Sequence, residues 1–249
     1  KLLKQLLSKL DYLSIEDKED IKKAYAFSSI SHEHQSRKSG EPYIQHPTAV
    51  ATTLAGLKLD KETISAGLLH DVLEDTTLGK TIIEREFGSD VLSLVDGVSK
   101  LDQIEYADNS QRQAESFRKM MLAMVKDIRV ILIKLADRLH NIQTLGALDQ
   151  KKQMRIGKET LEVYAPIANR LGIFNIKILL EQEAFKFAYP YRYKIISKGL
   201  KRRLGNQKKV LKKISIRIAN KLKEEKVLHD IEAREKDIFS VYKKMKKRH

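Results

Sequence analysis

The stretch LLHDVLEDT at residues 68–76 decides how the rest of the sequence is interpreted. It places His70 directly before Asp71, which offers an imidazole and a carboxylate to a single divalent cation. By itself, such a pair is more often the polar end of an amphipathic helix that faces water. Its interpretation therefore depends on which other segments supply ligands of the same kind.

The residues before this pair predict a helix. Asp60 is a suitable N-cap, and the apolar residues after it recur at helical spacing. If that helix continues through Glu74, then His70 and Glu74 lie one turn apart on one face, as do Asp71 and Asp75. One short segment would then present two metal ligands and two free carboxylates to the same cleft.

A second stretch, VILIKLADRLHN at residues 130–141, is apolar nearly all round as a helix and should form the buried centre of a bundle. Asp137 lies within it, and a buried carboxylate is unfavourable unless it is paired or bound to a metal. Asn141 lies one turn further along, and Thr144 continues the same face. An ion pair of Asp137 with Arg138 or with a lysine explains the carboxylate about as well as a ligand role does.

A third segment combines a basic loop with a histidine. QSRKSGEPY at residues 35–43 has the Gly and Pro of a loop and carries Arg37, Lys38 and Ser39 just ahead of His46. A basic loop is usually a solvated turn, but beside a metal ligand it is suited to binding phosphates. Three separate segments with metal-type ligands make the joint interpretation stronger than any one of them.

Composition limits the class of protein. The chain has 249 residues, 42% of them hydrophobic and only 6% aromatic, which favours a helical protein with a sizeable core. There is no cysteine, so a metal must be bound by histidines and carboxylates. No apolar run is long enough to span a bilayer and no signal-peptide pattern opens the chain, so we expect a soluble cytoplasmic protein.

The net charge of +15 is concentrated at one end of the chain. Residues 1–190 hold 27 basic and 27 acidic side chains, whereas residues 191–249 hold 21 and 6. Such a tail can attract a nucleic acid, an anionic nucleotide or an acidic partner, or can simply be a solvated helix face. Only Phe239 and Tyr242 follow Tyr193 as aromatic residues, so stacking on bases has little support and nucleic-acid binding is not expected.

Taken together, the patterns predict a mainly α protein. We expect a helical bundle at residues 1–150, connecting helices at 151–190 and a separate C-terminal segment at 191–249. That segment contains long basic helices, then a loose alternation from Val227 to Ala233 that predicts a strand, and then a further helix. The fold class is therefore a helical bundle followed by an incomplete α/β segment.

The ligand-bearing segments resemble a known family. His46, the pair His70-Asp71 and Asp137 are similar to the H…HD…D signature of the HD-domain metal-dependent phosphohydrolases. More closely, the chain resembles the Rel/Spo family of stringent-response enzymes, which make and degrade the alarmone (p)ppGpp. The resemblance covers essentially the whole chain and also rests on four further matches: RKSGEPYIQHP at residues 37–47, GVSKL at 97–101, LADRLHN at 135–141 and YAPIANRLG at 164–172.

The resemblance implies a role for each candidate residue. The implied ligands of one divalent cation, typically manganese in this family, are His46, His70, Asp71 and Asp137. The implied catalytic pair, which acts on the water, is Glu74 and Asp75. The implied contacts to the guanosine and its phosphates are Arg37, Lys38, Ser39, Lys100, Asn141 and Thr144. Gln143 stands where the family usually has Arg, which weakens any phosphate contact at that position.

The C-terminal segment, AREKDIFSVYKKM at residues 233–245, is similar to the opening of the family's synthetase domain. Arg234 and Lys236 match the family's ATP-contacting residues, but the carboxylate that binds the synthetase magnesium comes later in the family and is absent here. The resemblance thus implies an HD phosphohydrolase domain at residues 1–150 and an incomplete synthetase-like segment at 191–249. We expect no synthesis of (p)ppGpp by this chain.

The expected activity is hydrolysis of the 3′-pyrophosphate of (p)ppGpp to GDP or GTP and pyrophosphate. One alternative is an HD phosphohydrolase that acts on another nucleotide, and a second is a non-catalytic binding module that uses the basic tail. The expected partner is guanosine tetraphosphate or pentaphosphate, with no membrane contact. Contacts with regulatory proteins or the ribosome are expected only through regions outside this chain.

Overall fold

The computed structural model describes residues 1–75, 79–102, 118, 122, 126–204, 207–231 and 237–247. Within these ranges the regular structure is helical, and a β-bridge joins Ser36 to Pro42. The prediction of a mainly α protein is confirmed. None of the described helices is long and apolar enough to cross a bilayer.

The N-terminal helices pack around one aliphatic core. In chain order they are α1 (Leu2–Leu7), α2 (Ile15–Ser31), α3 (Gln45–Gly56), α4 (Lys61–Leu69), α5 (Val72–Asp75), α6 (Lys80–Phe87) and α7 (Ser89–Asp102). The core includes Leu54, Ile64 and Leu68, all fully buried. The predicted N-cap of α4 is confirmed, because the Asp60 carboxylate accepts a hydrogen bond from the Thr63 amide at 2.7 Å.

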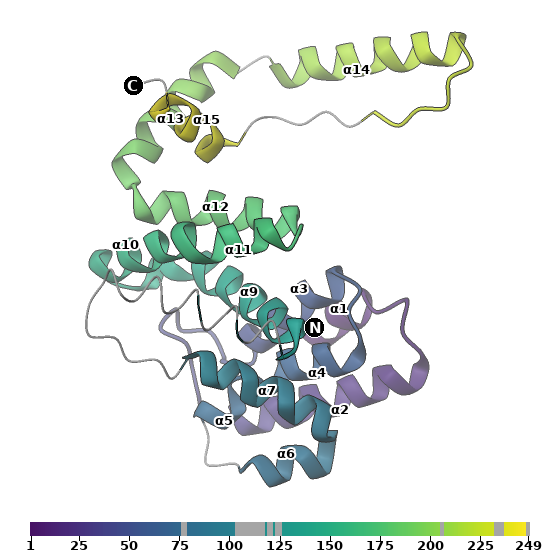
Figure 1. The fold of residues 1–249 in the computed structure, drawn as a ribbon, viewed down its shortest axis with the longest axis vertical. Helices are drawn as coiled ribbons and strands as arrows, with labels where there is room; N and C mark the ends of the chain where they lie inside the picture. The colour runs from purple at the N-terminus through teal and green to yellow at the C-terminus, as the bar shows by residue number, and fades with distance from the viewer. Residues whose placement is uncertain are drawn as a thin grey trace.

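Helix α9 (Ile128–Gln143) is shared between two cores, as Figure 1 shows by its place between the N-terminal helices and α10 to α12. Ile133 and Ala136 belong to the first core, whereas Leu135 and Leu139 belong to the second. A helix with apolar side chains on both faces must be covered on both sides. The prediction that this helix is the buried centre of a bundle is confirmed.

The second core is closed by the helices that follow α9. These are the short 3-10 turn Leu145–Ala147, α10 (Gln150–Glu159), the π-helical turn Thr160–Tyr164, α11 (Ala165–Arg170) and α12 (Phe174–Ala188). Helices α10 and α12 approach closely at Gly157, where an added Cβ would lie 2.8 Å from the backbone nitrogen of Ala188. The second core thus covers the face of α9 that carries Leu135 and Leu139.

The helix that leads to the His-Asp pair does not continue through it. Helix α4 ends at Leu69 and α5 begins at Val72, so the predicted helix before the pair is confirmed, and the condition that it continues through Glu74 is not met. The His70 Nδ1 lies 2.9 Å from the Gly67 carbonyl oxygen, a bond from side chain to backbone that competes with the helical ladder. His70 and Asp71 therefore occupy the turn between two helices.

The C-terminal segment consists of α13 (Pro190–Leu204), α14 (Gln207–Glu224) and α15 (Ile238–Lys246). The predicted strand from Val227 to Ala233 is not found in its described part, residues 227–231, so the incomplete α/β segment is not supported. A strand needs neighbouring strands to be stable, and Leu228 is fully exposed here. The rest of that prediction, residues 232–233, lies outside the described residues.

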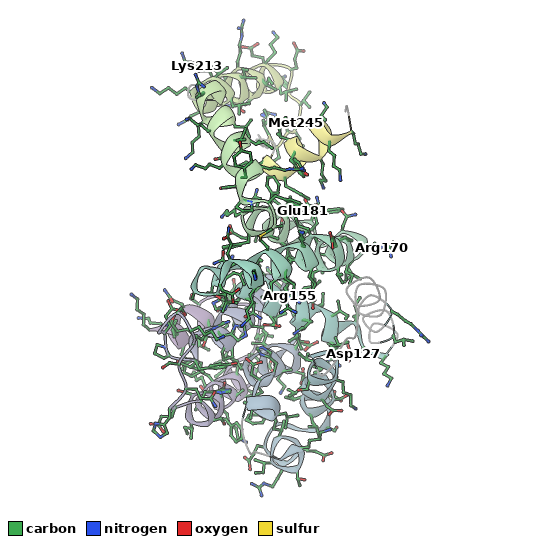
Figure 2. The ribbon with its side chains drawn as sticks, turned by 90° about the vertical axis from the view of Figure 1, so that its left-hand side faces the viewer. Asp127, Arg155, Arg170, Glu181, Lys213 and Met245 are labelled. Carbon is green, nitrogen blue, oxygen red and sulfur yellow. The ribbon has the colours of Figure 1, made fainter. Side chains whose placement is uncertain are left out.

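Helix α15 packs back onto the end of α12, whereas α14 extends away from the body (Figure 1). The Tyr242 ring stacks on Phe185 with centroids 5.0 Å apart, and Lys243 forms an ion pair with the buried Glu181 at 2.8 Å. Figure 2 places Glu181 at the junction between the helical body and the C-terminal helices. Thus α12 contacts both α9 and α15.

Candidate active site

Three buried side chains from separate elements meet between the two cores. His46 comes from α3, His70 from the turn after α4, and Asp137 from α9. One ligand atom from each residue lies within 4.8 Å of the others, and His46 Nε2 is 3.2 Å from Asp137 Oδ1. The structure thus brings together the three separate segments that the sequence singled out.

Asp71 borders this cluster. One carboxylate oxygen lies 3.1 Å from His70 Nε2 and the other lies 3.4 Å from His46 Nε2. The Tyr43 hydroxyl donates a hydrogen bond to Asp71 Oδ2 at 2.9 Å, and the Tyr43 ring stacks on His32 with centroids 4.6 Å apart. Tyr43 therefore sets the orientation of the Asp71 carboxylate beside the two histidines.

The donor set fits a divalent cation. His70 Nδ1 carries the proton because it faces the Gly67 carbonyl oxygen, which can only accept. Its Nε2 is therefore the ring nitrogen left for a cation, and among the described residues it is buried with no hydrogen-bond partner. An orphaned imidazole nitrogen beside two carboxylates is the arrangement that a metal ion completes, and imidazole with carboxylate suits several first-row divalent metals.

Asp137 is held by more than the histidines. Lys134 Nζ lies 2.8 Å from its Oδ2, and the Asn141 amide donates to its Oδ1. Burial would raise the pKa of Asp137, but the charges of Lys134, His46 and His70 outweigh burial and hold that pKa well below its usual range. The lysine ion pair weighed from the sequence is therefore present, with Lys134 as the partner, and it coexists with the ligand-like geometry.

The pKa values of His46 and His70 shift in opposite directions. Burial lowers the pKa of His46, although Asp137 opposes that change. Burial would also lower the pKa of His70, but the charges of Asp71 and Asp137 outweigh it and raise that pKa. His46 thus tends to stay neutral, as a metal ligand must be.

His140 lies on the far side of His46. Its Nδ1 is 2.8 Å from His46 Nδ1 and 2.9 Å from an Arg37 guanidinium nitrogen. A second nitrogen of Arg37 donates to Asn141 Oδ1 at 2.7 Å. Burial, together with the charges of His46 and Arg37, lowers the pKa of His140 to about 4, so this imidazole is neutral near pH 7.

A cleft of about 390 Å³ opens beside the cluster and is lined largely by polar and basic side chains. Of the residues expected to contact the guanosine and its phosphates, those that line it are Arg37, Lys38, Ser39, Asn141 and Thr144. The basic loop is closed by a hydrogen bond from the Gly40 amide to the Arg37 carbonyl oxygen, and Gly40 has φ +85°, which favours glycine. Arg37 and Asn141 belong both to the cleft wall and to the bonds around Asp137 and His140, so the cleft and the cluster form one site.

Other predicted residues are placed elsewhere or are not described. Lys100 lies on α7, exposed and paired with Asp96 at 2.6 Å, and it does not line the cleft. The backbone of Glu74 and Asp75 forms the end of α5, but their side chains lie outside the described residues. Arg234 and Lys236 also lie outside them.

The sequence patterns gave no role to two side chains that shape this site, Tyr43 and His140, whereas they offered a lysine and Arg138 as ion-pair partners of Asp137. Tyr43, Lys134 and His140 contact the cluster as described above. Arg138 lines the cleft, lies 3.9 Å from the centroid of the Tyr164 ring and pairs with Glu159 at 3.0 Å. Lys134 and His140 lie three residues either side of Asp137, so helical spacing was the available signal for both.

Residues 24–174 match the family described as HD domain, which is 151 of the 249 residues. The chain belongs to the HD-domain family. The matched range includes the whole His46, His70 and Asp137 cluster and the cleft beside it.

Relatives within this family support the more specific resemblance. The chain is 50% identical over 236 residues to the guanosine-3′,5′-bis(diphosphate) 3′-pyrophosphohydrolase of Vibrio cholerae serotype O1, covering 95% of this chain and 34% of that protein. It is 50% identical to the bifunctional (p)ppGpp synthase/hydrolase SpoT of Escherichia coli K12, over 94% of this chain and 33% of that one. A 45% identical relative from Myxococcus xanthus, covering 92% of this chain and 31% of the relative, is named GTP pyrophosphokinase. The resemblance to the Rel/Spo family is confirmed.

The chain spans about a third of the length of these relatives. A solved structure described as a metazoan ortholog of SpoT that hydrolyses ppGpp is also similar, with 28% identity and a TM-score of 0.52. The likeness covers 67% of this chain and 94% of that one.

Proposed function

We propose that this chain hydrolyses the 3′-pyrophosphate of (p)ppGpp to GDP or GTP and pyrophosphate, with manganese as the cation. The observation that carries the proposal is the joining of two features in one site. The buried cluster of His46, His70 and Asp137 suits a cation, and a polar, basic cleft lies beside it. Arg37 and Asn141 line the cleft and are hydrogen-bonded to each other, and Asn141 also donates to Asp137. The names of the relatives supply the substrate class.

The proposed cation ligands are His46, His70, Asp71 and Asp137. When bound, the cation would lower the pKa of a water molecule and polarise the scissile phosphorus. The chain's own part is to exchange protons: Glu74 or Asp75 takes a proton from the attacking water, and a proton reaches the leaving 3′-oxygen. The bond between the ribose 3′-oxygen and phosphorus breaks, and the water oxygen leaves with pyrophosphate.

The cleft would hold the rest of the substrate. Arg37 and Lys38 neutralise phosphate charge, and Ser39, Asn141 and Thr144 supply polar groups, whereas Lys100 on α7 does not line the cleft and would contact only substrate groups beyond it. Arg37 presents several donors in a planar fork, so it can serve a phosphate on one edge while its inner edge stays bonded to Asn141. The tight turn at Gly40 keeps this basic loop at the cleft mouth.

Synthesis of (p)ppGpp is not part of the proposal. Pyrophosphoryl transfer from ATP needs a magnesium held by a carboxylate and a group that activates the acceptor hydroxyl. Arg234 and Lys236 supply only positive charge. We also propose that the chain divides into residues 1–150, 151–190 and 191–249, that the protein is cytoplasmic, and that regulatory or ribosomal contacts run through other regions.

Product analysis tests the proposal. The chain is incubated with manganese and ppGpp, and the products are separated by anion exchange and identified by ³¹P NMR. Equimolar GDP and pyrophosphate are expected, with none from Asp71→Ala, and Glu74→Gln should lose about 10²–10⁴ of the rate if Glu74 is the acid/base group. Hydrolysis of a deoxynucleoside triphosphate or a cyclic nucleotide instead of ppGpp would show an HD phosphohydrolase of another nucleotide. No turnover of any nucleotide, with anion binding unaffected by Asp71→Ala, would favour a binding module.

A further inference from the structure

His140 contacts both a proposed metal ligand, His46, and the cleft residue Arg37. A single ring nitrogen, His140 Nδ1, faces both His46 Nδ1 at 2.8 Å and Arg37 Nη1 at 2.9 Å. The His46 and His140 rings lie with centroids 5.0 Å apart. None of the patterns in the sequence assigned a role to this residue.

The donor and acceptor roles follow from the chemistry of the guanidinium group. Arg37 has donors only, so His140 Nδ1 must offer a lone pair to it. His46 Nδ1 faces the same lone pair and must therefore carry the proton. His140 is then neutral with its own proton on Nε2, and this one acceptor serves two donors.

The protonation of His46 Nδ1 fixes the other nitrogen of that ring. Its Nε2 is left as a lone pair, 3.2 Å from Asp137 Oδ1 and 3.4 Å from Asp71 Oδ2. This is the ring form in which an imidazole binds a metal through Nε2. His70 reaches the same form differently, since its Nδ1 bonds to a backbone carbonyl. Each of the two histidines thus has its own acceptor.

We propose that His140 is a positioning residue: it accepts from His46 Nδ1–H, so that His46 presents its Nε2 lone pair to the cation, and it holds Arg37 beside the same site. This inference rests on the proposed metal site but not on the identity of the substrate. A carboxylate or a carbonyl more commonly plays this part beside a metal-binding histidine. Here the acceptor is a neutral imidazole. Arg37, which can only donate, faces the same nitrogen and so keeps it unprotonated.

The three substitutions Ala, Asn and Gln at position 140 separate this role from simple packing. Asn places its side-chain oxygen about where Nδ1 lies and can accept from both donors. Gln carries its polar group one atom further out, about where Nε2 lies, and has a more similar volume to histidine. His140→Asn is therefore the rescuing variant, and His140→Gln is the matched control.

Manganese binding to the metal-free protein is measured by the loss of the free-ion EPR signal. His140→Ala and His140→Gln should weaken manganese binding by about 10- to 100-fold, as loss of the group that orients a ligand usually does. His140→Asn should retain most of the affinity. Equal affinity of all four proteins, or equal losses for Asn and Gln, would overturn the proposal.

Long-range ¹H–¹⁵N NMR of the metal-free wild-type protein gives a second readout that does not depend on how the variants fold. It should find His140 protonated on Nε2 alone and His46 protonated on Nδ1 alone at pH 7. The opposite form of either ring would overturn the proposal. Neither measurement uses a nucleotide, so if ppGpp proved not to be hydrolysed while both results held, the proposed substrate would fail and the role of His140 would stand.

Discussion

Replacing Lys134 by methionine removes the ammonium group that forms an ion pair with the Asp137 carboxylate one turn further along α9. The Lys134 side chain is only 8% exposed and its Nζ lies 2.8 Å from Asp137 Oδ2. Methionine keeps most of the volume of the aliphatic stem but cannot donate a hydrogen bond. The variant therefore leaves a buried carboxylate that keeps the hydrogen bond from the Asn141 amide but has lost its ion pair with Lys134.

The size of the effect follows from the distance. Two unit charges 2.8 Å apart interact by about 6 kcal/mol at an effective dielectric constant of about 20. Part of that is offset in the native protein by the desolvation of Lys134 itself, and removing one partner of a buried pair typically costs about 3–5 kcal/mol. We expect Lys134→Met to lower the free energy of unfolding of the metal-free protein by about 3 kcal/mol at pH 7.

The loss of unfolding free energy caused by Lys134→Met should be larger at neutral pH than at acidic pH. The lowered pKa of Asp137 means that its ionised form stabilises the native state above the unfolded pKa near 3.8, and that this contribution is lost as pH falls below that value. Lys134 is one cause of the lowering. The difference between the wild-type protein and Lys134→Met should therefore be largest near neutral pH and should shrink below about pH 4.

Urea unfolding followed by circular dichroism, with a chelator present, measures the difference. Lys22→Met is the matched control, because Lys22 also pairs with a carboxylate three residues away, Glu19 at 2.6 Å, but both side chains are exposed. That control should change the free energy of unfolding by less than about 0.5 kcal/mol. If Lys134→Met cost no more than Lys22→Met, the buried ion pair would not be a stabilising feature of this site.

Three further predictions concern packing, the metal and pH. Gly157→Ala should destabilise the protein by about 1–3 kcal/mol in the same urea assay, because its Cβ would meet the α12 backbone, whereas Gly146→Ala, with open space around it, should not. Tyr43→Phe removes the hydroxyl that orients Asp71 and should weaken manganese binding by about tenfold, and unchanged affinity would show that Asp71 needs no such support. Because the pKa of His140 is lowered to about 4, the unfolded chain binds a proton between about pH 4 and 6.5 that the native protein does not, so stability should rise with pH across that window. His140→Asn should reduce that slope by up to one proton, and an unchanged slope would contradict the assignment.

Local signals in the sequence predicted the parts of the fold that local physics controls. The Asp60 N-cap and the burial of α9 on both faces are confirmed. Each follows from side chains within a few turns of one another. The proximity of His46, His70 and Asp137 is a longer-range result, and it could be anticipated because three segments carried ligands of matching chemistry.

The errors arose where a local pattern competed with a contact that the pattern does not encode. Helical spacing could not show that the His70 ring bonds to the Gly67 carbonyl in the turn between α4 and α5. The alternation after Val227 resembled a strand, but no described strand lies beside residues 227–231 to pair with it. Apolar alternation reports which side chains avoid water and does not supply a neighbouring strand.

The side chains that support the site were missed for a related reason. Tyr43 meets Asp71 across 28 residues, and His46 meets His140 across 94. A tyrosine in a loop or a histidine at the end of a helix has many ordinary roles, so neither identifies its partner. The cluster of metal-type ligands was recognisable by chemistry, whereas the groups that orient those ligands became visible only with the fold.

The proposed function requires that the buried cluster, loaded with one divalent cation, hydrolyses the 3′-pyrophosphate of ppGpp. The most direct measurement is a titration of the metal-free chain with manganese at saturating ppGpp, with pyrophosphate release followed at each addition. We expect turnover to rise linearly and to saturate at one manganese per chain, with GDP and pyrophosphate formed in equal amounts. Turnover that is already complete in chelator, or no release of pyrophosphate at any manganese concentration, would contradict it.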